Sequence, residues 1–127
     1  MKRGLLIPAA ALAAILAFCL WNGAAMASRA ARWRAQLAEA DRLAQAEKWE
    51  DAAAAIRRSY ADWTAGQTYL HVVANHEAVD GAEAMYHRSL AFAESREGSE
   101  LRAELADLRE RLRELAEMEE LSWRNVL

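Results

Sequence analysis

The feature that most constrains this chain is an apolar stretch near its N-terminus. Lys2 and Arg3 precede 22 residues, 5–26, that contain no charged side chain. A helix of about 20 apolar residues crosses the hydrocarbon core of a bilayer. The chain is therefore expected to divide into a short basic N-terminus (1–4), a transmembrane anchor or signal peptide (5–27) and a domain formed by residues 28–127.

The apolar stretch has two interpretations. Ala25 and Ala27 form the small-residue pattern at which signal peptidase cleaves, which predicts secretion after Ala27. The apolar centre is longer than the 7–15 residues or so of a typical signal peptide, which favours an uncleaved anchor with Trp21 at the membrane interface. Cys19 follows the bulky Phe18, which is not typical of a lipoprotein signal, so Cys19 is interpreted as an apolar residue of the span.

The charge pattern indicates the location of the domain and excludes one class of partner. Basic residues lie on both sides of the span, and we expect the N-terminus inside a bacterial cell membrane with the domain extracytoplasmic. Residues 28–127 carry 14 basic and 19 acidic side chains, a net charge of −5. This balance argues against nucleic acid as a partner.

The composition favours helix throughout. The chain has five Gly, one Pro and one Cys, so it cannot form an internal disulfide or a cysteine-based zinc site. Apolar residues recur every three or four positions in four segments. These stripes are Trp33, Leu37, Ala40 and Ala44; Trp49, Ala53, Ile56, Tyr60 and Trp63; Val72, Val79, Ala82, Tyr86, Leu90 and Ala93; and Leu101, Leu105, Leu108, Leu112 and Leu115.

The stripes predict an all-α fold, with the N-terminal transmembrane or signal helix followed by a small bundle of about four helices. Turns are expected near Lys48 and Gly98, giving two tetratricopeptide-like hairpins whose turns are about 50 residues apart, unlike the 34 of that repeat. Gly66 is expected to stop the second helix, and Gly98 to end the third, with Ser99 capping the fourth. The third helix, about 68–96, should continue through Gly81, whose cost would be offset by a close helix crossing. The fourth is expected to fade at "LSWRNVL".

Four polar residues on the third helix form a candidate site. His76, Asp80, Glu83 and His87 are spaced so that they lie in one row, as the ligands of metal-binding bundles do. The facing helices supply no Glu-x-x-His pair, and "HEAVD" lacks the second His of a zincin. We therefore favour a polar edge that helps to pack the hairpins, with metal binding as the alternative and no cofactor predicted.

Three further segments carry a resemblance to a known family. They are "WEDA" at 49–52 with Trp63, "HEAVD" at 76–80, and "EELSWRNVL" at the C-terminus. With the N-terminal span, they resemble the bacterial membrane-anchored family catalogued as domain of unknown function 4363, over nearly the whole chain. The resemblance implies a structural motif formed by His76, Glu77, Val79 and Asp80, and it implies no known activity.

The sequence predicts a non-enzymatic function. It contains no phosphate loop, nucleophile elbow or paired catalytic carboxylates, and no small-molecule substrate is evident. We expect a scaffold or accessory subunit for another membrane or envelope protein, the alternative being a metal- or ligand-binding sensor that uses the His76 row. Trp123, beyond the last stripe, is expected to pack back on the bundle or to contact a partner.

Overall fold

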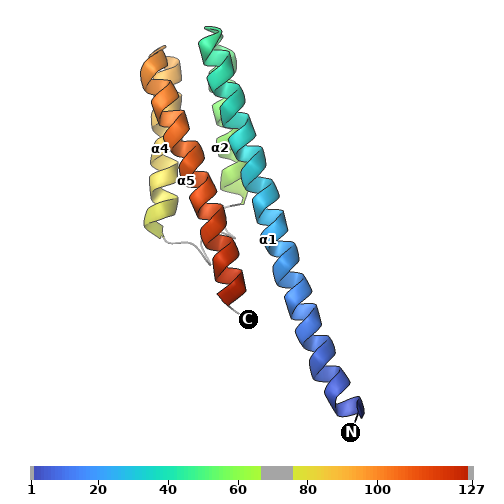
Figure 1. The fold of residues 1–127 in the computed structure, drawn as a ribbon. Helices are drawn as coiled ribbons and strands as arrows, with labels where there is room; N and C mark the ends of the chain where they lie inside the picture. The colour runs from blue at the N-terminus through green and yellow to red at the C-terminus, as the bar shows by residue number, and fades with distance from the viewer. Residues whose placement is uncertain (1, 67–75, 126–127) are drawn as a thin grey trace.

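The computed structural model describes residues 2–66 and 76–125, with side chains for 4–66 and 77–121. This part of the chain forms four helices and no strand: α1 (Lys2–Gln45), α2 (Trp49–Ala65), α4 (His76–Glu94) and α5 (Gly98–Asn125) (Figure 1). The expectation of an all-α fold with an apolar N-terminal helix is confirmed. The expected start of the third helix, 68–75, lies outside the described residues.

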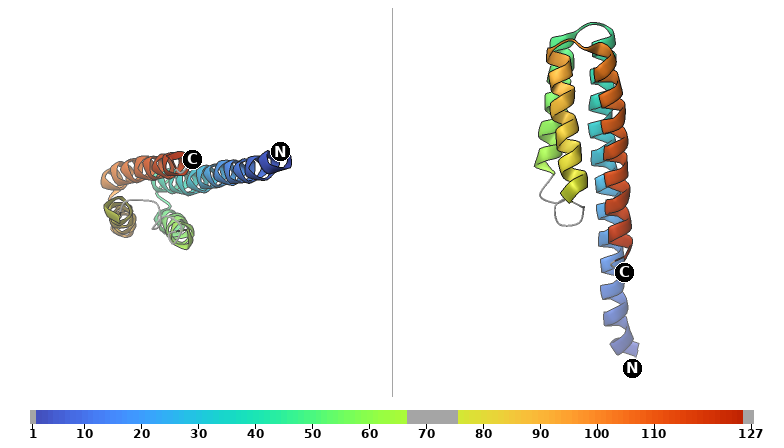
Figure 2. Two further views of the ribbon diagram at one scale, coloured as in Figure 1. Left: turned by 90° about the horizontal axis from the view of Figure 1, so that it is seen from below. Right: turned by 90° about the vertical axis from the view of Figure 1, so that its left-hand side faces the viewer.

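The helices pack as an antiparallel bundle. α1 contacts α2 and α5, and α4 contacts the same two helices from the other side. Seen from one end, the four helices occupy the corners of an irregular square (Figure 2, left). The two hairpins therefore share one core, to which every helix contributes its apolar stripe.

α1 is much longer than the bundle. It passes through residues 27 and 28, the expected domain boundary, without a break, and its N-terminal part extends beyond the other helices (Figure 2, right). Among the described helices it is the one that is long and apolar enough to cross a membrane. Residues 4–18 are exposed along their whole length, so no other described part of the chain covers them.

A two-helix region connects this exposed segment with the bundle. Cys19, Asn22 and Met26 are buried, at spacings of three and four residues. The Cγ atom of Glu120 lies 3.7 Å from the position that a Cβ atom would occupy on Gly23, so α5 runs beside this part of α1. We call α1 residues 19–29 together with α5 residues 113–125 the stem, and residues 30–66 with 76–112 the head.

The head has a core of large side chains. Trp33, Trp63 and Tyr86 are almost completely buried, and Gly66 lies so close to Trp33 that a Cβ atom there would be 3.3 Å from the indole. The stripes expected from the sequence form this core, although Trp49, Tyr60 and Leu90 are only half-buried and Val72 lies outside the described residues. All five leucines of the fourth stripe are buried: Leu101, Leu105, Leu108, Leu112 and Leu115.

Both hairpin turns have the same geometry and lie at the same end of the bundle (Figure 1). After α1, the amide of Lys48 donates a 2.9 Å hydrogen bond to the carbonyl oxygen of Leu43. After α4, the amide of Glu97 donates a 2.9 Å hydrogen bond to the carbonyl oxygen of Phe92. These six-residue bonds are Schellman caps. Each cap requires a left-handed residue, here Glu47 (φ 60°) and Arg96 (φ 58°). The expected turn positions are confirmed.

Three details differ from the sequence-based expectation. Gly98 is the first residue of α5 and does not end α4, because Arg96 adopts the left-handed conformation. α5 continues to Asn125, since the packing of its last turns against α1 extends the helix beyond its leucine stripe. Gly81 continues α4 as expected, but no atom of the described residues lies within 4 Å of a Cβ placed there, so none of the described helices crosses closely enough to offset its cost.

Candidate functional site

The polar row predicted on α4 lies at the edge of the seam between α2 and α4. Asp80 and His87 are exposed and Glu83 is half-buried, whereas the side chain of His76 lies outside the described residues. The structure brings two members of the row together: the Nε2 atom of His87 is 3.8 Å from Oε1 of Glu83. The proposed pairing of His76 with Asp80 therefore stays a prediction.

Glu83 also has a partner on the neighbouring helix. The hydroxyl of Tyr60, on α2, donates a 2.9 Å hydrogen bond to Oε1 of Glu83. The ring of Tyr60 lies 5.2 Å from the ring of His87, centroid to centroid. The hydrogen bond to the carboxylate raises the pKa of Tyr60, and partial burial raises it further. Tyr60, Glu83 and His87 thus form a polar clamp across the α2–α4 seam.

This clamp does not have the composition of a metal centre. Among the residues that the structure describes, no group of three or more His, Cys, Asp or Glu side chains is arranged to hold a metal ion. The Oε1 atom of Glu83 accepts the hydrogen bond from Tyr60 and is also the oxygen nearest to His87. The arrangement joins two helices through hydrogen bonds.

A second, buried network lies directly behind the clamp. The hydroxyl of Ser59 donates to the carbonyl oxygen of Trp33 at 3.1 Å and lies 2.8 Å from the hydroxyl of Tyr86. Because the Ser59 proton is used toward Trp33, Tyr86 is the donor to Ser59. Burial raises the pKa of Tyr86 well above its usual range. The network links α1, α2 and α4 at one level of the head.

The structure places the "HEAVD" motif at the start of α4. Val79 is completely buried in the core, Ala78 is half-buried, and Glu77 and Asp80 are exposed. The apolar part of the motif thus packs α4 into the head. The roles of Glu77 and Asp80 as parts of a structural motif stay predictions.

The bundle surface has a groove between α2 and α4 near the two hairpin turns. It has a volume of about 470 Å³ and is lined by both helices. Arg57 and Glu94 bridge it with an ion pair of 3.2 Å, and the half-buried Trp49 forms part of one wall. The remaining lining residues are Glu50, Ala53, Ala93 and Arg96. The groove thus carries an aromatic side chain and charged side chains of both signs.

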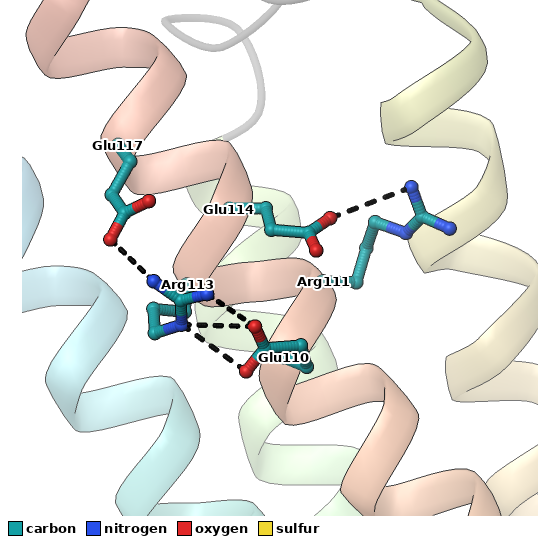
Figure 3. Close-up of polar contacts among 5 residues, drawn as sticks. All are labelled: Glu110, Arg111, Arg113, Glu114 and Glu117. Carbon is teal, nitrogen blue, oxygen red and sulfur yellow. Dashed lines mark hydrogen bonds and ion pairs between the residues drawn. The ribbon is translucent and has the colours of Figure 1, made fainter.

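The outer face of α5 carries a ladder of charged residues (Figure 3). Arg113 lies between Glu110 and Glu117 and forms ion pairs with both, and Arg111 is 3.8 Å from Glu114. The guanidinium of Arg113 holds the pKa of Glu110 below its usual range. Exposed pairs at this spacing contribute little stability, so the ladder is a solvated helix face.

Sequence reasoning missed the partners that complete these networks. Tyr60 and Tyr86 were assigned only to apolar stripes, and Ser59 was assigned no role. The signal was their position: Ser59 and Tyr60 are neighbours at the polar border of the α2 stripe, where a hydroxyl faces the next helix. Trp123, which we expected to pack back on the bundle or to contact a partner, belongs to the last turns of α5, and its side chain lies outside the described residues.

Together, the fold and these surfaces define a class of protein: an antiparallel helical bundle built on one long helix with an apolar N-terminal half. The chain belongs to the family described as Domain of unknown function (DUF4363), whose model matches residues 21–126. The resemblance inferred from the sequence is thereby confirmed. No curated protein and no solved structure matches the chain.

Proposed function

We propose that this chain is a bacterial single-pass membrane protein whose extracytoplasmic bundle is a non-enzymatic scaffold or accessory subunit for another membrane or envelope protein. The observation that carries the proposal is the uninterrupted α1. It joins an exposed apolar segment, residues 4–18, to a helix that is one quarter of the bundle. Removing the N-terminal part would remove part of the folded domain.

The contacts of the stem support an anchor over a cleaved signal peptide. Cleavage after Ala27 would remove Cys19, Asn22 and Met26, all of which are buried in the folded chain. The matched family region begins at residue 21, so it includes most of these residues. Met26 belongs to the same buried cluster as Leu115, so its loss would expose apolar surface of that cluster.

The anchor is tested on the full-length chain expressed in a bacterial cell. We expect an intact mass that includes residues 1–27 and retention in the membrane after alkaline carbonate extraction. The matched variant is Leu12→Arg with Leu16→Arg, because each arginine at the centre of a span costs about 2.5–3.5 kcal/mol in insertion. We expect this variant in the soluble fraction. A mature chain that begins at Ser28 would disprove the anchor.

The groove between α2 and α4 supports the role as a scaffold. It combines an aromatic side chain, Trp49, with charges of both signs on Glu50, Arg57 and Glu94. Tryptophan and arginine are the residues most enriched at the energetic centres of protein interfaces. A groove of this composition at the end of the bundle distant from the anchor suits a peptide or helix of another envelope protein.

The partner is sought with a photo-crosslinking amino acid at Arg57 and, as the control, at Glu117 on the charged face of α5. We expect one discrete crosslinked membrane or envelope protein from position 57 and none from position 117. Loss of the crosslink in a Trp49→Ala background would support the groove as the contact. Equal crosslinking from both positions would contradict a specific scaffold.

The sensor using His76, Asp80, Glu83 and His87 is the alternative. It is tested by metal analysis of the full-length protein and by thermal unfolding with and without a chelator. Stoichiometric metal, lost together with thermal stability in His87→Ala, would establish the sensor. An unchanged unfolding midpoint on chelation would disprove it.

A further inference from the structure

The stem overlaps the predicted membrane span, so its depth in the bilayer must be considered. α5 runs antiparallel to α1, with Glu120 beside Gly23, and continues as a helix to Asn125. Five further residues advance α5 by about 7.5 Å, which brings its end level with about residue 18 of α1. The region that the sequence assigns to the span, residues 5–26, therefore contains two helices over its last turns.

The end of α5 cannot lie in hydrocarbon. The last four carbonyl groups of a helix have no partner within the helix, and unsatisfied backbone groups are not tolerated among lipid tails. The exposed Glu117 is only two turns from the end. The hydrocarbon core must therefore begin below the stem, on the single-helix part of α1.

The single-helix part is too short for an average bilayer. Residues 4–18 span about 22 Å at 1.5 Å per residue, whereas the hydrocarbon core is about 30 Å thick. The difference of about 8 Å matches the depth to which amphipathic helices enter the interface between headgroups and lipid tails, about 5–10 Å. The stem is thus drawn into this interfacial layer by the shortness of the anchor.

The exposed surface of the stem includes large apolar side chains, which the interfacial layer favours. Met118 and Leu121 on α5 and Trp21 on α1 are large apolar side chains that remain 40%, 55% and 67% exposed. Among the described residues, the other exposed large apolar side chains all lie on α1, between Leu5 and Leu20. The exposed large apolar side chains of the described residues are therefore confined to α1 up to Trp21 and to the last turns of α5.

We infer that the C-terminal end of α5 is a second membrane contact, which seats Met118 and Leu121 in the interfacial layer of the bilayer beside Trp21. The inference rests on the proposed anchor, because it is the position of the anchor that fixes the depth of the stem. The molecule would thus be held at the membrane by a helix that spans it and by a helix that ends on it.

The test measures depth in the full-length protein, reconstituted in vesicles of phosphatidylglycerol and phosphatidylethanolamine. Cys19, the single cysteine, is replaced by alanine, and one cysteine is introduced at Leu121 for an environment-sensitive fluorophore. Asp107, exposed on the same helix and about 21 Å farther from the membrane, is the matched control. Leu12, exposed in the anchor, reports on the span itself.

We expect the fluorophore at position 121 to be several-fold less accessible to aqueous iodide than that at 107, and to be quenched best by nitroxides near the lipid headgroups. Iodide quenching at 121 equal to that at 107, with position 12 protected, would overturn the interfacial contact and leave the anchor standing. Protection from iodide at position 121 without quenching by lipid nitroxides would mean that protein covers this position in place of lipid. That result would also overturn the interfacial contact. Accessibility at position 12 would overturn the anchor as well.

Discussion

The head and the stem use the same two helices, α1 and α5, in different ways. In the head, Trp33 and Leu37 of α1 are buried, and α1 packs against both α2 and α5. In the stem, α1 buries Cys19, Asn22 and Met26, and α5 passes close to Gly23. Two helices leave more of each other exposed than four do, and the buried set in the stem includes an amide and, on α5, the side chain of Glu119.

The head and the stem are therefore stabilised in different ways. The head is ordered by its own core, because its aromatic and leucine side chains are removed from water by neighbouring helices. The stem has less apolar area to bury and polar groups in its seam. It therefore depends more on its surroundings, which in the proposed function are the bilayer interface. Mutations should have global effects in the head and local effects in the stem.

The largest effect is expected from Trp63→Ala in the head. Trp63 is completely buried, and truncation of a core tryptophan costs about 3–5 kcal/mol of unfolding free energy. The matched control is Trp21→Ala in the stem, where the indole is 67% exposed and a change within about 0.5 kcal/mol is expected. Chemical denaturation of the full-length protein in detergent measures both. Equal effects would contradict the division into head and stem.

The next effect is expected from Met26→Ala, which removes a buried side chain of the stem. Truncation of a buried methionine costs about 2–5 kcal/mol when the whole fold depends on it. Here we expect the loss to appear as local opening, with faster amide exchange in α5 residues 113–121 and little change in residues 98–108. Ser28→Ala, at an exposed position nearby, is the control. Uniformly faster exchange along α5 would show that head and stem unfold together.

A mutant cycle addresses the polar network within the head. Ser59→Ala leaves the buried Tyr86 hydroxyl without its acceptor, at a cost of about 1–3 kcal/mol. Adding Tyr86→Phe removes that hydroxyl, so the double variant should recover part of the loss. Thermal and chemical unfolding of the four proteins give the coupling energy. Strictly additive losses would mean that the Ser59–Tyr86 bond contributes no specific stability.

The same network predicts a dependence on alkaline pH. The folded state raises the pKa of Tyr86, chiefly through burial, so the stability it contributes is complete below the ordinary tyrosine value of about 10 and is lost as the pH rises above it. The unfolding free energy should fall by up to about 1.4 kcal/mol per pH unit in this window. Tyr86→Phe should reduce the slope. An unchanged slope would assign the pH dependence to other groups.

The smallest effect is expected on the charged face of α5, where Arg113 pairs with Glu110 and Glu117 near the border of head and stem. Exposed pairs of this kind contribute about 0.2–0.5 kcal/mol each, and salt screens them. Arg113→Ala should lower the unfolding free energy by less than about 1 kcal/mol, with the difference shrinking at high salt. A larger loss that persists in salt would indicate that this face packs against something in the assembled protein.

The sequence predicted the head better than the stem. Stripes such as Leu101 to Leu115 repeat in phase with the helix, so periodicity alone identifies the buried face. In the stem, an apolar stretch exposed to lipid and one packed against protein have the same composition. Cys19 and Met26 were therefore assigned to the span, and the contact with α5 became visible only in three dimensions.

For the polar networks, too, contacts within one helix could be predicted from the sequence and contacts between helices could not. The spacing of Glu83 and His87 on one helix is encoded locally, and the structure brings that pair together. The hydrogen bond from Tyr60 depends on how α2 and α4 are aligned, which no local pattern specifies. The left-handed Glu47 and Arg96 were missed for another reason: glycine is the usual signal for that conformation, and neither turn uses it there.

Because α1 is unbroken, a tilt of its N-terminal part would move the head as well. Beyond residue 18 it continues for about 40 Å to its end at Gln45, where the first hairpin turn begins. Spanning helices tilt by about 20° on average, and by amounts that vary with bilayer thickness. A tilt of that size would carry the distant turn about 14 Å sideways. In the proposed function, local membrane thickness would thus determine where above the surface the head can meet a partner.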